Sequence, residues 1–393
     1  MNEMKCLTLA CGCAAALAAA AASPARADGS VEISGLIDGG VAYVADIHGR
    51  NGTSSAWQAK TGDVNVSRWI MSGQEPLGHD LRALFLLANG FSITNGAAGQ
   101  QGRLFGFQSY AGIASDSFGT LTTGRQFDSM LQLVQPFALG GTPYGGVAFA
   151  HPYDNDDLAN YTRTNNSLKY TSPDFGGFRF GYTYGFSNAA GGFDDSRGYS
   201  VAASYRNGPF AIGASYLEFD NESNSPAANT NGAEPAGAPF NAGRQRTFGV
   251  GSLYASGKVR VAAIVTETRL NDATSINNVA DTPVALAGDS IVFQNVEVSF
   301  RYALTPRLSV ATAYTFTLGT FDTPKGRYRP KWHQLGVIGM YALSPHTDTY
   351  IEGIYQRADD LDGTGLPGAQ ISNFPAASGP NQLVVTVGVR HTF

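Results

Sequence analysis

Charged side chains of opposite sign occupy different parts of this chain, and their spacing suggests electrostatic chemistry. Arginine and lysine recur at alternating positions within several extended stretches. One long segment supplies carboxylates instead, from Asp128 and from "DNDD", which contains Asp154, Asp156 and Asp157. Carboxylates gathered in this way can bind metal ions or act as acids and bases, and opposed charges can create a local field. Which of these applies depends on the elements that position the charges.

The same carboxylates could instead bind Ca²⁺, which prefers clustered oxygen ligands. "DNDD" lacks the loop glycine and the distant glutamate of an EF-hand, and "DDLDG" (359–363) is expected in a hydrated external loop. We therefore predict no metal site.

Other sequence motifs that could indicate catalysis or cofactor binding lack the neighbouring residues or elements that such sites require. "GTGLPG" (363–368) fits G-x-G-x-x-G, but Pro367 interrupts it and no strand-to-helix unit surrounds it. The six histidines are scattered singly without an H-E-x-x-H pair, and no G-x-S-x-G elbow is present. We predict no catalytic residues and no cofactor, so the chain is not expected to be an enzyme.

Residues 1–27 are predicted to be a cleaved secretory signal peptide. Lys5 precedes an uncharged apolar run, and Ala25 and Ala27 form an A-x-A cleavage site. A membrane anchor is the alternative, but the run is rich in alanine and shorter than the ~20 residues of a membrane-spanning helix. All three cysteines lie in this segment: Cys6, Cys11 and Cys13. The predicted mature chain, 28–393, therefore has no thiol for a disulfide or a metal site.

The overall composition is that of neither a soluble domain nor a helical membrane protein. The formal net charge is −5, which disfavours a nucleic-acid partner. Charged residues make up 15% of the chain, against about 25% in typical soluble domains, while Gly (48), Tyr (18) and Phe (23) are abundant. No later apolar stretch approaches the ~20 residues of a membrane helix.

Alternation with a period of two is the dominant pattern. In "FRFGYTYGF" (178–186), aromatic residues occupy one face of an extended strand, and small or charged residues occupy the other. Similar segments of ~10 residues, the length of a tilted transmembrane strand, recur along the chain. We predict sixteen strands: 30–44, 65–72, 81–91, 103–114, 119–126, 166–171, 178–186, 198–206, 210–219, 244–254, 258–269, 290–303, 307–317, 331–343, 347–356 and 382–393.

The connections between these strands alternate between short and long. "RNGP" (206–209) and "LTPR" (304–307) are tight turns, whereas 127–165 and 357–381 are long and polar. Outer-membrane barrels have short turns at one end and long loops at the other, and their sheet must close because lipid cannot satisfy backbone polar groups. The last strand ends on Phe393, whose ring is expected at the membrane interface. The fold class is therefore an all-β, sixteen-stranded antiparallel transmembrane barrel.

Parity along the strands assigns charged residues to the inner face. Arg125 shares the parity of an outward residue, but a kink at Gly124 could turn it inward, so its direction stays open. The inner face is expected to carry Arg68, Arg82, Lys169, Arg179, Arg206, Lys258, Arg260, Arg301 and Arg390 against Glu32, Asp38 and Glu297.

At this point the sequence resembles the general porins of Gram-negative bacteria, in the form found in β-proteobacteria. The resemblance rests on "VEISGLIDGGVAYV" (31–44), "SRWIMSGQEPLGHDLRALFLLANGF" (67–91), "GRLFGFQSYAGIASDSFGTLTTGRQFDSMLQLVQPF" (102–137), "NNSLKYTSPDFGGFRFGYTYGF" (165–186) and "VGVRHTF" (387–393). It implies a homotrimer of barrels in the outer membrane, a third loop at about 127–165 that folds inward, and passage of small hydrophilic solutes and ions. It also implies contact with outer-membrane lipid and with the barrel-assembly machinery.

We expect this loop to set its carboxylates opposite a basic wall and so form a constriction. The acidic side would comprise Asp128, Asp154, Asp156 and Asp157. The basic side would comprise Arg68, Arg82, Arg125, Lys169 and Arg179, with Arg68 and Arg82 at its centre. Because fixed charge next to the path outweighs loop charge screened within ~8 Å, we expect a weak preference for anions.

The sequence departs from the resemblance on one wall, which leaves alternatives open. Leu84, Leu86 and Ala88 take the inner face, where the family usually carries polar residues. One alternative is a substrate-specific channel, in which Leu84 and Leu86 form a binding track with loop aromatics. The loop aromatics in question are Tyr144, Phe149, Tyr153 and Tyr161. A barrel enzyme and a surface adhesin are further alternatives.

Overall fold

The structure is a computed structural model that describes residues 29–49, 52–159, 162–221, 229–235, 237–277 and 283–393. The predicted signal peptide lies outside the described residues. Among the described residues, no helix combines the length and apolar character that a membrane span requires.

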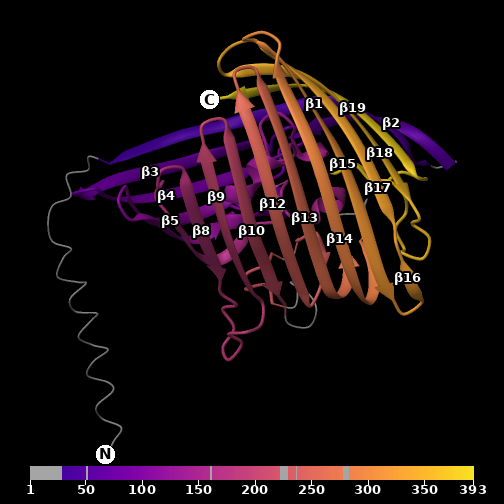
Figure 1. Cartoon of the computed structure of the whole chain (residues 1–393), viewed down its shortest axis with the longest axis horizontal. Coiled ribbons are helices and arrows are strands. Elements are labelled where there is room, and N and C mark those ends of the chain that lie inside the picture. Colours follow the sequence, from indigo (N-terminus) through magenta and orange to yellow (C-terminus); the bar gives the residue numbers. More distant parts are fainter. Residues whose placement is uncertain (1–28, 50–51, 160–161, 222–228, 236, 278–282) are drawn as a thin grey trace, which may run out of the picture.

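Sixteen antiparallel strands form one closed barrel (Figure 1). The prediction of sixteen strands is confirmed. The barrel strands are β1 (Ser30–Gly49), β3 (Arg68–Gly78), β4 (Leu81–Gly90), β5 (Gln108–Ser115), β6 (Gly119–Gln126), β7 (Thr164–Thr171), β8 (Phe178–Gly185), β9 (Arg197–Asn207), β10 (Phe210–Asp220), β12 (Arg244–Ser256), β13 (Val259–Ile276), β14 (Val284–Ala303), β15 (Leu308–Thr323), β17 (Lys331–Ala342), β18 (Thr347–Asp359) and β19 (Asn381–Thr392).

Three further strands extend the sheet at its long-loop end. They are β2 (Gly52–Thr61), β11 (Phe240–Asn241) and β16 (Gly326–Tyr328). β2 lies between the predicted strands 30–44 and 65–72, in a segment expected to be a long loop, and this expectation is corrected. It pairs with the second half of β1, and the Tyr43 and Trp57 rings meet with centroids 5.2 Å apart.

Closure of the barrel depends on β1, which pairs along both edges. One edge runs antiparallel to β19, from Leu36 opposite Thr392 to Val44 opposite Val384. The other edge pairs first with β3 and then with β2. Just past β19, Gly35 and Phe393 exchange two backbone hydrogen bonds of 2.8 and 3.1 Å.

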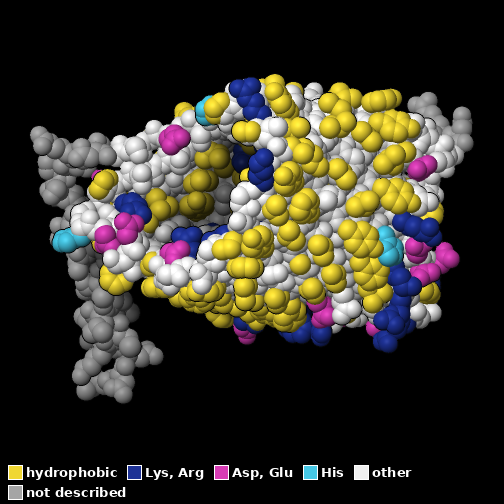
Figure 2. Space-filling model, turned by 45° about the horizontal axis from the view of Figure 1, so that its top comes forward, with side chains coloured by type: hydrophobic (Ala, Val, Ile, Leu, Met, Phe, Trp, Pro, Cys, Tyr) yellow, Lys and Arg dark blue, Asp and Glu magenta, His cyan; other side chains and the backbone are white. Residues whose placement is uncertain are grey.

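Apolar side chains on the outside of the barrel alternate with covered ones. Val41, Val265 and Val387 are 50, 54 and 55% exposed, whereas the neighbouring Ala42 and Ile264 are at most 1% exposed. Figure 2 shows hydrophobic side chains spread over the outer surface, with charged side chains mainly toward the two ends. An apolar belt of this extent would be unfavourable in water, so it indicates a lipid environment.

Connection lengths differ between the two ends of the barrel. One end, here named the short-turn end, has connections such as 208–209 and 304–307, and the chain terminus at Phe393 lies there (Figure 1). The opposite long-loop end carries segments such as 91–107 and 360–380; the first includes the short helix α2 (Gly99–Gly102). The longest connection, 127–163, joins β6 to β7 and contains α3 (Ser129–Val134), η1 (Gln135–Phe137), η2 (Val147–Phe149) and η3 (Pro152–Asp154).

Candidate functional site

The connection 127–163, here named the inserted loop, packs against inward-facing side chains of later strands. At its start, the Asp128 carboxylate accepts a hydrogen bond of 2.6 Å from the Met130 backbone and caps α3. The Ser129 backbone donates to the Ser200 hydroxyl of β9 at 2.9 Å, and its own hydroxyl bonds that of Thr183 of β8 at 2.9 Å. These contacts begin a seam that continues around the inner wall.

Two aromatic rings of the inserted loop rest on glycines of the wall. A Cβ at Gly336 would come within 2.3 Å of the Phe149 ring, and a Cβ at Gly213 within 2.6 Å of the Phe137 ring. Both rings are buried, at 2 and 3% exposure. Glycine at these wall positions is therefore what allows the loop to lie this close to the sheet.

A buried charge network fastens the middle of the inserted loop. The His151 imidazole lies between two carboxylates, with Nδ1 2.6 Å from Asp156 Oδ2 and Nε2 3.2 Å from Glu297 Oε2 on β14. Asp156 also accepts from the Thr266 hydroxyl at 2.6 Å, and Glu297 accepts from the Leu139 backbone at 2.7 Å. Burial lowers the pKa of His151, but Asp156 and then Glu297 outweigh it and raise that pKa to about 10. The imidazole is therefore protonated and carries the charge that both carboxylates need.

The expected acidic side of a constriction needs correction. Asp128, Asp154, Asp156 and Asp157 are all at most 3% exposed, so none presents its carboxylate to a passage. Asp154 accepts from the Ala159 backbone at 2.8 Å, and Asp157 accepts from the Thr162 backbone at 2.7 Å. These carboxylates hold the shape of the loop and its attachment instead. The sequence pattern could not show this, because it contains no information on which backbone groups each carboxylate meets.

The wall opposite the inserted loop remains open to solvent. On β13, β14 and β17, inward residues such as Thr266, Asn295 and Gln334 are at most 3% exposed because the loop covers them. On β3 to β5, by contrast, inward residues are only half-buried: Arg68, Ile70, Leu84, Leu86 and Tyr110. Figure 2, turned toward the short-turn end, shows an opening whose visible wall is mostly hydrophobic, with Lys and Arg at its margin. The inner face of β3 to β5 is therefore more accessible than that of β13, β14 and β17.

Three arginines lie close together at the long-loop end, and we name them the arginine cluster: the half-buried Arg68 and Arg125 and the buried Arg163. The Arg68 and Arg163 guanidinium carbons lie 5.0 and 4.6 Å from the centre of the Phe107 ring. Arg163 also lies 4.9 Å from the centre of the Phe127 ring. Arg68 and Arg125 take part in none of the ion pairs within the described residues. The cluster therefore carries a local positive charge.

A backbone irregularity sets the direction of Arg125, which parity left open. Gly124 has a φ of +140°, and the register with β7 shifts between Gly124 and Gln126. The Arg125 guanidinium then donates to the Gly106 carbonyl at 2.8 Å and to the Asn165 side chain. The kink thus turns Arg125 toward the connections at the long-loop end. Phe107 and Arg163 were not predicted as site residues. Phe107 fell within the predicted strand 103–114, but β5 begins only at Gln108, and Arg163 fell within the predicted loop 127–165.

The remaining predicted basic residues do not join the arginine cluster. Arg82 pairs with Asp116 at 2.8 Å in the short turn after β5, at the opposite end of the β3–β4 hairpin from Arg68. Lys169 is mostly buried and donates to the Phe127 carbonyl at 2.9 Å. Arg179 is exposed near the start of β8, at the short-turn end. The expectation that Arg82 is at the centre of the basic wall is therefore corrected, because Arg82 lies at the short-turn end of the barrel and Arg68 at the long-loop end.

Inward arginines of later strands contact the inserted loop rather than the path. Arg301 stacks 3.9 Å from the centre of the Tyr144 ring, and Arg260 donates to the Pro136 carbonyl. Arg390 donates to the Pro143 carbonyl at 2.8 Å and pairs with Asp348 at 2.9 Å. The inner-face assignment of these arginines agrees with their contacts.

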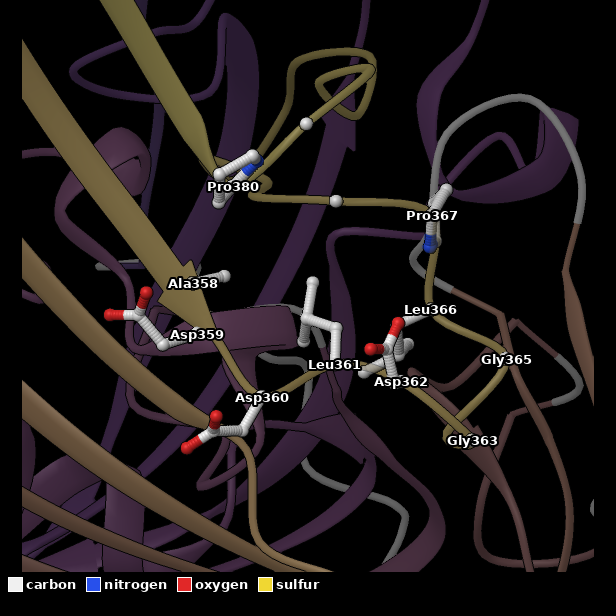
Figure 3. A pocket seen from close by; sticks show the side chains of 12 residues that line it. Ala358, Asp359, Asp360, Leu361, Asp362, Gly363, Gly365, Leu366, Pro367 and Pro380 are labelled. Atoms are coloured by element: carbon white, nitrogen blue, oxygen red, sulfur yellow. The ribbon is translucent and has the colours of Figure 1, made fainter.

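A separate cavity of about 520 Å³ opens at the long-loop end, between β18 and β19 (Figure 3). Asp359 pairs with Arg357 at 2.8 Å and Asp360 with Lys331 at 3.1 Å. Figure 3 shows the Asp359 and Asp360 side chains pointing away from Asp362. These carboxylates do not converge, and no group of three or more His, Cys, Asp or Glu within the described residues could hold a metal ion.

The sequence of this chain is similar to those of porins of the outer membrane. A family model described as Gram-negative porin matches residues 14–361. An outer membrane porin protein of Bordetella pertussis is 32% identical over 280 residues, covering 65% of this chain and 68% of that protein. Outer membrane porin protein 32 of Delftia acidovorans is 27% identical over 377 residues, covering 94 and 95%.

Solved structures agree on the fold. The anion-selective porin from Comamonas acidovorans superposes with a TM-score of 0.67 at 21% identity, covering 93% of this chain and all of that one. A trimer form of OmpT from Vibrio cholerae gives a TM-score of 0.60 at 15% identity, covering 93 and 99%.

Proposed function

This chain belongs to the Gram-negative porin family, and from that premise we propose that its channel prefers small anions. As a porin it is an outer-membrane protein that lets small hydrophilic solutes and ions diffuse passively, and it is not an enzyme. The finer question is which charge the path favours, and that depends on the groups beside it.

The observation that carries the proposal is the unequal placement of the charges. Arg68 and Arg125 are only half-buried at the long-loop end, and Arg68 shares the Phe107 ring with the buried Arg163. The loop carboxylates are buried, and Asp156 is already neutralised by His151. Guanidinium groups stay charged at all physiological pH values, and stacking on an aromatic ring holds them in place. Charge next to the path outweighs charge on outer loops, which salt screens within ~8 Å.

The inserted loop has a second role in the proposal, which is to narrow the passage. Its contacts with β8, β9, β14 and β17 support a position inside the barrel, on one side of the lumen. Solutes would then pass between the loop and the wall formed by β3 to β5. Size selection would follow from this narrowing, and charge selection from the arginines beside it.

The assembly is proposed by analogy with relatives. Three copies are expected to associate, as in the trimer form of OmpT from Vibrio cholerae. Contact of the apolar belt with outer-membrane lipid, and insertion by the barrel-assembly machinery, belong to the same proposal.

The direct test is single-channel recording of refolded residues 28–393 in a planar bilayer with a potassium chloride gradient. We expect ohmic steps in groups of three and a reversal potential of the sign that chloride preference gives. Arg68→Gln is expected to move the reversal potential toward zero. A potential of the sign for potassium preference would overturn the anion proposal, and a folded barrel without conductance would overturn the channel itself.

A further inference from the structure

The inner face of β3 to β5 carries an apolar patch where an aqueous passage would favour polar side chains, although Ser72, Gln74 and Gln108 share that face. The residues concerned, here named the apolar wall, are Ile70, Leu84, Leu86 and Tyr110. Register places Leu86 between Ser72 of β3 and Tyr110 of β5, and Leu84 one step closer to the short-turn end. Neighbouring strands lie about 4.8 Å apart, and every second residue along a strand is about 6.7 Å further on. The four side chains therefore form one continuous patch.

Solvent reaches the apolar wall, whereas two aromatic residues of the inserted loop, Phe149 and Tyr153, pack in buried clusters on the other side of the barrel. Each of the four wall side chains is only half-buried. Phe149 and Tyr153 are 2% exposed and belong to clusters against the opposite wall. The expected track of loop aromatics is therefore corrected for these two residues, and Tyr161 lies outside the described residues. Tyr144, the remaining loop aromatic, is half-buried and stacks on Arg301. The wall side of that track is therefore the part considered below.

The arginine cluster adjoins the apolar wall. Arg68 and Ile70 are two positions apart on the same face of β3, which separates their α carbons by about 6.7 Å. The Arg68 guanidinium lies against Phe107 and has no carboxylate partner among the described ion pairs. A cationic group thus stands at one end of an apolar surface, and the path runs along both.

We propose that Arg68 and the apolar wall together bind small amphipathic anions, meaning carboxylates that carry an alkyl chain or an aromatic ring. The carboxylate pairs with Arg68, while the hydrocarbon covers Ile70, Leu86 and Tyr110 toward the short-turn end. Charge attraction alone would favour every small anion equally, so the apolar wall provides the discrimination. This inference rests on the proposed anion channel and names the substrate class of that path.

The test compares two unbranched carboxylates of equal carbon number, hexanoate and gluconate, on the refolded channel. Each is added at increasing concentration to a constant potassium chloride solution, and chloride current is recorded. Hexanoate is expected to reduce the current in a saturable way, because a bound anion occupies the path. Gluconate is expected to reduce it only at much higher concentration, because its hydroxyl groups gain nothing from the apolar wall.

Variants locate the effect. Leu84→Asn/Leu86→Asn is expected to raise the half-blocking concentration of hexanoate about tenfold, since contact of each methylene with an apolar surface corresponds to about fourfold in affinity. Leu84→Met/Leu86→Met keeps the apolar character at similar volume and is expected to retain the block. Circular dichroism confirms the strand content of each variant, and each chloride current without carboxylate serves as its own reference.

The outcomes separate this inference from the proposed function. If chloride is preferred but hexanoate and gluconate block alike, the amphipathic site is overturned and the anion channel stands. If hexanoate blocks Leu84→Asn/Leu86→Asn at the same half-blocking concentration as wild type, the apolar wall is not the site. Preference for potassium over chloride would overturn both.

Discussion

His151 of the inserted loop lies 3.2 Å from Glu297 of β14, measured from Nε2 to Oε2, although 146 residues separate them in the chain. Together with Asp156, this contact ties the loop to the far wall by a buried ion triad. In the proposed channel, this attachment would hold the middle of the loop on the side of β14.

Removing the cation of this triad is expected to loosen the loop. His151→Asn leaves Asp156 and Glu297 buried without their counter-charge, a loss of about 3–5 kcal/mol in stability. We expect a lower denaturation midpoint and more current noise in single-channel records. His79→Asn, the same substitution in an exposed turn, is the control and is expected to leave both unchanged. Equal effects of the two substitutions would contradict the role of the triad.

The same triad predicts a pH dependence on the alkaline side. The pKa of His151 is raised from 6.5 to about 10, so its stabilising contribution is complete below pH 6.5 and is lost as pH rises through about 10. Wild-type current noise is therefore expected to increase between pH 9 and 11, a range set by this pKa. In His151→Asn the noise should be high and independent of pH across that range. An unchanged noise level in wild type at pH 11 would count against the assignment.

The two arginines at opposite ends of the β3–β4 hairpin are expected to differ in their effect on selectivity. Arg68→Gln removes a charge beside the path, so the chloride-to-potassium permeability ratio should fall severalfold. Arg82→Gln removes a charge that is paired with Asp116 at the short-turn end, so the ratio should stay near that of wild type. Reversal potentials in a salt gradient measure both. A larger change for Arg82→Gln would contradict the location of the cluster.

The glycine under Phe149 is expected to tolerate no side chain. Gly336→Ala places a methyl group within 2.3 Å of that ring, and overpacking of this kind costs about 1–3 kcal/mol. Thermal unfolding should shift downward for this variant. Gly353→Ala on β18 is the matched control, because a Cβ there meets no atom within 4 Å. Equal unfolding temperatures for both variants would show that the ring does not depend on the glycine.

The strands were predictable because side chains alternate between the two faces of a strand, which gives the sequence a period of two. Strand order also held a signal that parity alone did not use. Arg68 begins β3 at the long-loop end, while Arg82 is the second residue of the antiparallel β4 at the short-turn end, so the two cannot be neighbours. Counting positions from each turn would have separated them. Parity gives the face on which a residue lies, and the number of positions from the turn gives its place along the barrel axis.

The charges of the inserted loop were not predictable in the same way. Asp156 accepts a hydrogen bond from Thr266, which is 110 residues away in the chain, and no local sequence pattern marks either residue as a partner of the other. Glu297 was placed on the inner face, yet nothing in the sequence connected it with one of six scattered histidines. Arg163 lies in the inserted loop, where parity assigns no direction, and Phe107 precedes β5 although it had been placed in the predicted strand 103–114.

The seam between the inserted loop and the wall also constrains the order of folding. The loop bonds Ser200, Glu297 and Gln334 across separations of 71, 158 and 184 residues, so most of its attachments are made by strands synthesised after it. Contacts of such long range are slow to form because the intervening chain must be ordered first. The loop can dock only after β8 to β17 have assembled around it. The loop is therefore expected to reach its final position late, when the strands that hold it are already in place.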